Sequence, residues 1–200
     1  MSEDLSALKS AMVLPVVMYG HPALRQKGTR IDAISPMITE LIDNMLETMH
    51  AYHGVGLAAQ QVGQALQLTV IDVSEVTDRP SWAEQDGVPL PLKALSPLVL
   101  INPKVTPVGP IESGPEGCLS FPEMFAEITR PGVVDVEALN AWGEPVRFRC
   151  GGLLARAVQH EVDHLNGILF IDRMSATAKS ELQPELDALQ AVTRALLEKR

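Results

Sequence analysis

The feature that most constrains this chain is the segment His160-Glu161-Val162-Asp163-His164, which ends a largely apolar run of residues. Gly151-Gly152 precede the run and Gly167 follows it, which is how a helix with a terminal cap is punctuated. On such a helix, positions four apart share a face, so the two imidazoles lie about 5–6 Å apart at the backbone. They supply half of a tetrahedral metal site, and Glu161 lies between them, placed to act on water. The sequence therefore predicts a metal-bearing helix.

A five-residue match of this kind also recurs by chance, so a third ligand decides what it means. Cys118 is the candidate, because the small and turn-forming residues of segment 113–120 leave it accessible. Two histidines and one thiolate would leave a fourth coordination position open, as catalytic sites do and structural sites do not. Cys150 is interpreted as a small buried hydrophobic residue.

Segment 54–63 contains two further glycines, two alanines and two amide side chains before its final glycine. This composition indicates a backbone that another group approaches closely. The segment is not a phosphate loop, because the lysine and hydroxyl residue of that motif are absent. By itself it fits a tight structural turn equally well.

Length and charge limit the classes of protein. The chain has 200 residues, 46% of them apolar, enough for one domain with a core or two small ones. A net charge of −9 argues against a nucleic-acid surface as the main function. No apolar run reaches membrane-spanning length, the acidic start Met1-Ser2-Glu3-Asp4 is unlike an export signal, and two cysteines fit a reducing compartment. We therefore expect a cytoplasmic protein, from a bacterial-type cytoplasm or an organelle descended from one.

Hydrophobic periodicity predicts the other elements. The clearest is a helix capped by Ser35 and started by Pro36, with His50 and His53 at its end in a structural role. Segment 77–97 contains four prolines and is interpreted as a surface excursion. The remaining expectations are an N-terminal extension (1–12), an extended segment (13–19), strands at 68–73, 99–105 and 168–171, a hairpin of 133–138 with 146–150, and a C-terminal helix from about residue 176 whose apolar face is Leu182, Leu186, Leu189, Val192 and Leu196.

Three segments together resemble the peptide deformylase family: 54–61, 116–120 and 159–167, in this order. The resemblance covers about residues 13–175 and implies an α+β fold, with antiparallel sheets wrapped around the metal-bearing helix. The implied organisation is an N-terminal extension (1–12), a catalytic domain (13–175) and a C-terminal helix (176–200). Members of that family remove the N-formyl group from the initiator methionine of nascent chains and release formate.

Matching positions carry the family's roles to this chain. The resemblance implies that Cys118, His160 and His164 hold the metal and that Glu161 is the general base. It further implies that the Gln61 amide and the Leu119 N–H donate to the formyl oxygen. Gly54 and Gly56 would let the peptide lie alongside as an added strand. The walls of the methionine pocket would be Val55, Gly56, Leu153, Ala157 and the His160 ring.

The resemblance also implies a cofactor and partners. One divalent metal ion is expected, Fe²⁺ in bacterial members, and the donor set also suits Zn²⁺, Ni²⁺ and Co²⁺. The expected partners are nascent formylated peptides, with the protein itself a monomer. Phe125 stands where some bacterial members carry an arginine near the peptide. In bacterial relatives the C-terminal helix helps docking at the ribosome, but its mixed charge here gives that partner weak support.

Two other functions compete with this one. A His-Glu-x-x-His zinc peptidase would take its third ligand downstream, where no histidine follows His164 and only a polar tail offers glutamates. A metal-stabilised binding module would need neither Glu161 nor Gln61.

The sequence also predicts an ion pair that supports the site, because Asp163 is expected to point away from the metal and needs a partner. Arg130 is the candidate for that partner, and a solvated Asp163 is the alternative.

Overall fold

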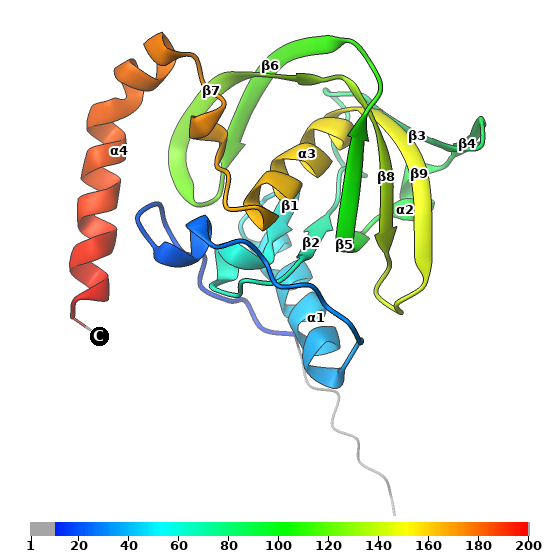
Figure 1. The fold of residues 1–200 in the computed structure, drawn as a ribbon, viewed down its shortest axis with the longest axis horizontal. Coiled ribbons are helices and arrows are strands. Elements are labelled where there is room, and N and C mark those ends of the chain that lie inside the picture. Colours follow the sequence, from blue (N-terminus) through cyan, green and yellow to red (C-terminus); the bar gives the residue numbers. More distant parts are fainter. Residues whose placement is uncertain (1–10, 200) are drawn as a thin grey trace, which may run out of the picture.

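The computed structural model describes residues 11–199, so most of the expected N-terminal extension lies outside the described residues. Seven antiparallel strands form one sheet, and a two-stranded arm, β6–β7, arches beside it (Figure 1). The α+β architecture with antiparallel sheets around a central helix is confirmed. In spatial order the sheet is β1 (Gly56–Ala58), β2 (Leu68–Ile71), β5 (Leu98–Pro107), β8 (Val133–Leu139), β9 (Pro145–Gly152), β3 (Ser81–Gln85) and β4 (Val88–Leu90); the arm is β6 (Ile111–Cys118) and β7 (Phe121–Pro131).

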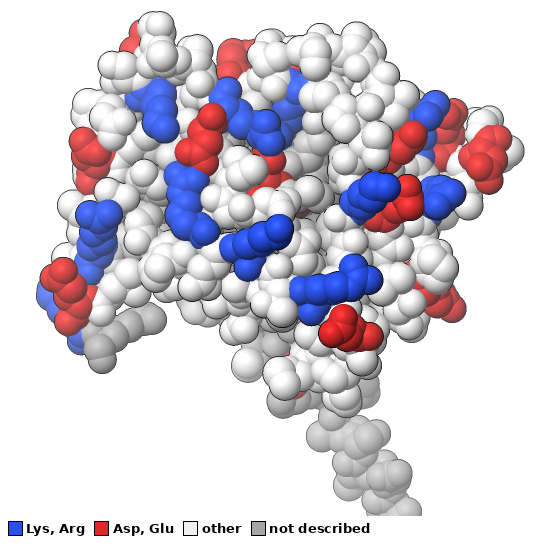
Figure 2. Space-filling view, in the orientation of Figure 1, with Lys and Arg blue, Asp and Glu red and all other residues white. Residues whose placement is uncertain are grey.

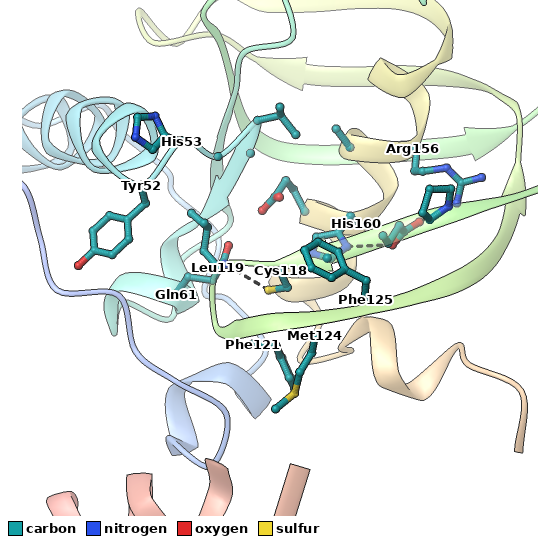
Figure 3. A pocket seen from close by; sticks show the side chains of 18 of the residues that line it. Tyr52, His53, Gln61, Cys118, Leu119, Phe121, Met124, Phe125, Arg156 and His160 are labelled. Atoms are coloured by element: carbon teal, nitrogen blue, oxygen red, sulfur yellow. Dashed lines mark hydrogen bonds and ion pairs between the residues drawn. The ribbon is translucent and has the colours of Figure 1, made fainter. Parts of the chain in front are cut away.

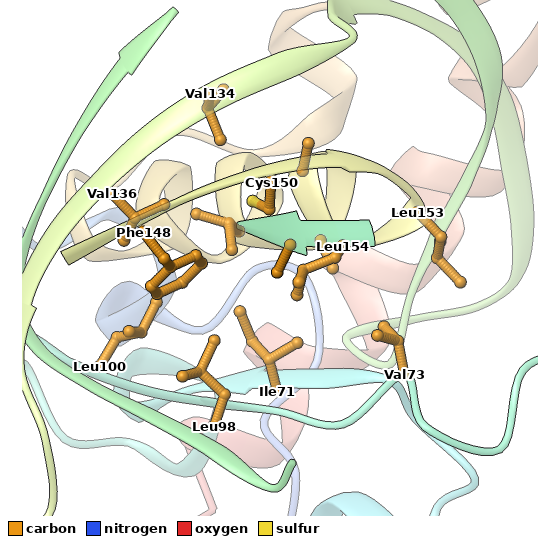
Figure 4. Close-up of a cluster of buried hydrophobic side chains, with 14 residues drawn as sticks. Ile71, Val73, Leu98, Leu100, Val134, Val136, Phe148, Cys150, Leu153 and Leu154 are labelled. Carbon is orange, nitrogen blue, oxygen red and sulfur yellow. The ribbon is translucent and has the colours of Figure 1, made fainter. Parts of the chain in front are cut away.

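The first half of the sheet is covered on both faces, which explains why all four residues of β2 and the first four of β5 are buried. Along β2, Leu68 and Val70 face the core cluster of helix α1 (Pro36–Ala51), whereas Ile71 faces the cluster of helix α3 (Leu153–Leu165). Side chains alternate between the faces of a strand, so a run buried on both sides shows no alternation of buried and exposed positions. Figure 4 shows the cluster between the sheet and α3.

Helix α3 crosses the concave side of the sheet because its start is fixed by a close backbone contact. Gly152 has φ 68°, and a Cβ there would lie 2.1 Å from the carbonyl oxygen of Pro80, so only glycine fits. The Leu154 N–H then donates to the Ser81 hydroxyl at 3.0 Å. The predicted helix is confirmed, and its axis is locked to β3 and β9.

A third cluster joins the arm to the C-terminal helix α4 (Ala176–Leu197), through Leu182, Leu186 and Leu189. The helix was expected, but two members of its predicted apolar face were wrong: Val192 and Leu196 are each 59% exposed. The expected strand at 168–171 is also wrong. The structure has a short 3-10 helix there, η3 (Phe170–Asp172). The prediction failed because an apolar run that is buried on every side shows no periodicity that separates a strand from a helix.

Segment 77–97 lies at the surface as expected, but it is more ordered than its prolines indicate. It contains β3, β4 and the short helix α2 (Leu92–Leu95). Proline is tolerated here because Pro89 lies on β4, the edge strand, while Pro80 and Pro91 flank the elements. The segment therefore adds two strands to the sheet that the sequence does not predict.

The other predicted elements are present. The α1 helix, strands β2 and β5, and the β8–β9 hairpin lie where expected. A short 3-10 helix η1 (Pro22–Arg25) precedes α1, and a second, η2 (Ala59–Val62), lies between β1 and β2. Segment 13–19 is extended without joining a sheet; the N–H groups of Val17 and Tyr19 donate to the carbonyls of Gln61 and Ser120. Among residues 11–199 no helix is long and apolar enough to cross a bilayer.

Candidate active site

Three donor side chains from two separate elements meet at the inner face of α3. Cys118 ends β6, while His160 and His164 lie one turn apart on α3 with ring centroids 5.0 Å apart. The Cys118 Sγ lies 3.3 Å from the His164 Nε2, and the three donor atoms all lie within 4.8 Å of one another. Within residues 11–199 this is the only group of three His, Cys, Asp or Glu side chains spaced to hold an ion. The chain thus brings together the three residues that the sequence nominates as metal ligands.

Glu116 orients one of these ligands, a function that the sequence analysis did not assign. Its Oε2 lies 3.0 Å from the His160 Nδ1, which leaves the other ring nitrogen free to face Cys118. Arg130 donates to both Glu116 oxygens, at 2.6 and 2.9 Å. Burial alone would raise the pKa of the Glu116 carboxyl, but hydrogen bonds from His160 and Arg130 outweigh it and lower that pKa. The signal in the sequence was the acid two residues before Cys118.

The predicted pair of Asp163 and Arg130 is confirmed, with Nη1 donating to Oδ2 at 2.7 Å. Arg173 also donates to both oxygens of Asp163, a contact that the sequence analysis missed. Since Arg130 bridges Glu116 on β6 and Asp163 on α3, the pair fixes the cysteine-bearing strand against the histidine-bearing helix.

Glu161 is buried beside the trio, 4% exposed, and its Oε2 has no hydrogen-bond partner among the described residues. Burial raises the pKa of Glu161 to about 7, so this carboxyl can both accept and release a proton near neutral pH. A Cβ on Gly56 would lie 2.4 Å from the Glu161 Oε1. Glycine at position 56 therefore makes room for the carboxylate.

The Gln61 amide is aimed at the same point. Its Oε1 accepts from the Ala58 N–H at 2.8 Å, so its Nε2 faces the Cys118 sulfur and the Ser120 hydroxyl, each at 3.5 Å. The extended segment 13–19 bonds to the backbone on both sides of this contact, at Gln61 and Ser120. The Gln61 amide N–H is thus held beside the Cys118 sulfur, and Leu119, the residue after Cys118, also lines the cavity.

A cavity of about 700 Å³ opens onto these groups (Figure 3). The expected walls Val55, Gly56, Leu153 and Ala157 all line it, together with His160, Glu161, Gln61 and Leu119. His53 also lines the cavity, although the sequence analysis gave it only a structural role. Phe125 lies at the rim, 70% exposed. Cys150, in contrast, is fully buried in the sheet, and burial raises the pKa of its thiol to about 12.

Comparison with known proteins gives a consistent picture. The model of the polypeptide deformylase family matches residues 13–180. A peptide deformylase of Opitutus terrae is 41% identical over 189 residues, covering 92% of this chain and 96% of that protein. One from Methylacidiphilum infernorum is 44% identical over 179 residues, covering 90% and 94%. The crystal structure of a peptide deformylase from Synechococcus elongatus in complex with actinonin is 36% identical, covers 92% and 93%, and has a TM-score of 0.72.

Proposed function

This chain belongs to the peptide deformylase family, and on that premise we propose that its cavity hydrolyses the N-formyl group of formyl-methionine at the start of nascent polypeptides. The observation that carries the proposal is the meeting of Cys118, His160 and His164 beside Glu161 and the Gln61 amide. The family is one of metal-dependent hydrolases, so the site must be judged by how well it holds an ion.

The donor set fits a divalent metal ion. The three donor atoms converge, the His160 ring is oriented by Glu116, and one thiolate with two imidazoles leaves a coordination position open. An ion held there supplies Lewis-acid chemistry and makes water acidic enough to ionise near pH 7. The alternative of a peptidase loses support, since the glutamates of the tail lie on α4 and none belongs to the ligand group.

The residues of the chain would then perform the proton transfers. Glu161 takes a proton from the water that attacks the formyl carbon, and it returns that proton to the amine nitrogen as the C–N bond breaks. The Gln61 amide and the Leu119 N–H donate to the oxygen that becomes negatively charged, work typically worth roughly 3 kcal/mol for one donor. Formate and a free methionyl amine are the products.

The substrate peptide would lie along an open sheet edge. Strand β1 is the last strand of the sheet and pairs only with β2, so its outer edge can accept an extended chain. The methionine side chain would enter between Val55, Leu153 and Ala157. The formyl group has only hydrogen on its carbonyl carbon, so a tight fit at Gly56 would exclude acetylated chains.

We further propose that the native ion is Fe²⁺, which this donor set suits as well as it suits Zn²⁺, Ni²⁺ or Co²⁺. Cytoplasmic action is a further proposal, supported by the free thiols of Cys118 and Cys150, and we propose that the protein acts there as a monomer. Figure 2 shows Lys and Arg interleaved with Asp and Glu across the face that includes α4. This mixture gives little support to docking at the ribosome through that helix.

One assay tests the function. Metal-loaded protein should release formate from formyl-Met-Ala-Ser and leave an unformylated peptide intact at its internal bonds. Internal cleavage would favour the peptidase, and neither reaction would favour a binding module.

A further inference from the structure

Arg79 is a cation in the cavity wall that the reaction itself does not use. It precedes β3 and lines the cavity, and its Nη2 donates to the Pro115 carbonyl at 3.3 Å. It forms no ion pair within residues 11–199. Arg156, the other arginine of the wall, is already paired with Glu116 at 2.9 Å. The charge of Arg79 therefore remains available to a ligand.

Arg79 lines the same cavity as the residues proposed to hold the methionine side chain. On α3, Leu153, Arg156 and Ala157 share one face, and the Arg156 guanidinium reaches the Gly114 carbonyl on β6 (Figure 3). The Arg79 guanidinium donates to the carbonyl of Pro115, the residue after Gly114 on β6. An acid of the cavity wall, Glu123, comes from β7, beyond the turn that follows Cys118.

The spacing along β6 relates Arg79 to one residue of the substrate. Pro115 lies three residues before Cys118, which is about 10 Å in a strand. An extended peptide with its formyl carbon at Cys118 and its chain directed toward Pro115 reaches the same distance at its third residue. Side chains alternate along an extended chain, so residue three shares the face of the methionine.

We propose that Arg79 selects nascent chains that carry an acidic side chain at the third residue. This inference rests on the proposed deformylase function and assigns a role to the proline-rich segment 77–97, which brings the guanidinium to the cavity. Because Arg79 is only partly buried, the effect is that of an exposed ion pair, about 2- to 5-fold in kcat/KM. It should act mainly through KM, since the pair forms on binding, and weaken in 1 M salt.

The test compares ratios of kcat/KM within each protein, so a general loss of activity cancels. The substrates are formyl-Met-Ala-Glu and formyl-Met-Ala-Lys, amidated at the C-terminus to remove the terminal carboxylate. A second pair places Glu or Lys at residue two. The proteins are wild type, Arg79→Gln, Arg79→Glu and the control Arg30→Gln, whose side chain is 72% exposed and lies outside the cavity lining.

Wild type and Arg30→Gln should favour Glu over Lys at residue three, Arg79→Gln should lose the preference, and Arg79→Glu should reverse it. The ratio at residue two should be the same in all four proteins. A ratio at residue three that ignores position 79, or a response at residue two alone, would overturn the proposal while leaving deformylation intact. Absence of formate release by metal-loaded wild type would overturn the proposed function, and this inference with it.

Discussion

Replacing Glu116 with Gln tests the buried ion network behind the three candidate metal ligands. The carboxylate accepts four hydrogen bonds: two from Arg130, one from Arg156 and one from His160, at 2.6 to 3.0 Å. The substitution keeps the shape but leaves Arg130, which is 3% exposed, with only Asp163 as counter-charge. Breaking a buried pair costs roughly 3–5 kcal/mol, and we expect the lower end because Asp163 remains.

For a chain of this length, about 3 kcal/mol lowers Tm by roughly 6–12 °C. The melt should be recorded on the metal-free protein, so that ion binding does not contribute. Asp135→Asn is the matched control, since it removes an equally bidentate but exposed pair with Arg149 and should change Tm little. Losing the acceptor for His160 should also weaken metal affinity about 10- to 100-fold in chelator competition.

The pH dependence follows from the lowered pKa of Glu116. A carboxyl with a folded-state pKa below its unfolded value of 4.5 contributes its full stability above that pH and loses it as pH falls further. The Tm difference between wild type and Glu116→Gln should therefore be constant from pH 6 to 7.5 and shrink below about pH 4.5. If the Tm of Glu116→Gln equals that of the Asp135→Asn control at neutral pH, the network does not stabilise the fold and the reasoning is refuted.

The other predictions concern the reaction. Glu161→Ala should retain metal but lower kcat about 10²–10⁴-fold; metal analysis showing an emptied site would make Glu161 a ligand instead. Gln61→Leu should lower kcat more than it raises KM, roughly 10²-fold or more, and a change in KM alone would assign Gln61 to substrate positioning. Gly56→Ala should reduce kcat, because its methyl group displaces the Glu161 carboxylate; an unchanged rate would mean that the carboxylate has room to move. Iron-loaded enzyme should lose activity in air as Cys118 is oxidised, whereas zinc-loaded enzyme should be slower and air-stable, as timed activity and mass spectrometry of Cys118 would show.

Sequence reasoning performed best where one residue type has few uses. Two histidines a turn apart and a cysteine among glycines nominate metal ligands by their chemistry, and the structure brings all three side chains together. Asp163 could be paired with Arg130 because a buried acid requires a partner. Glu116 was not recognised, because an acid on a strand looks solvated until the fold buries it against two arginines.

The errors in the fold have related causes. The run at 168–171 is buried all round, so periodicity could not separate a strand from a 3-10 turn. Strand β3 was hidden by the prolines around it, Pro80 and Pro89, and its pairing with the distant β9 cannot be read from the sequence. Val192 and Leu196 continue the helical spacing of apolar residues along α4, but they lie beyond Leu189, the last α4 residue in the cluster with the arm. The apolar pattern therefore extends further along the helix than the buried contact does.

The attachment of β3 has a consequence for the order in which the molecule forms. Ser81 receives the N–H of Leu154, 73 residues further along the chain, and β3 pairs with no strand made before β9 other than its own hairpin partner β4. Contacts this distant in sequence close late and slow folding. During synthesis the β3–β4 hairpin, which follows Arg79 in the chain, therefore cannot join the sheet until β9 has emerged. This enzyme of nascent chains completes its own cavity only when nearly all of its own chain has been made.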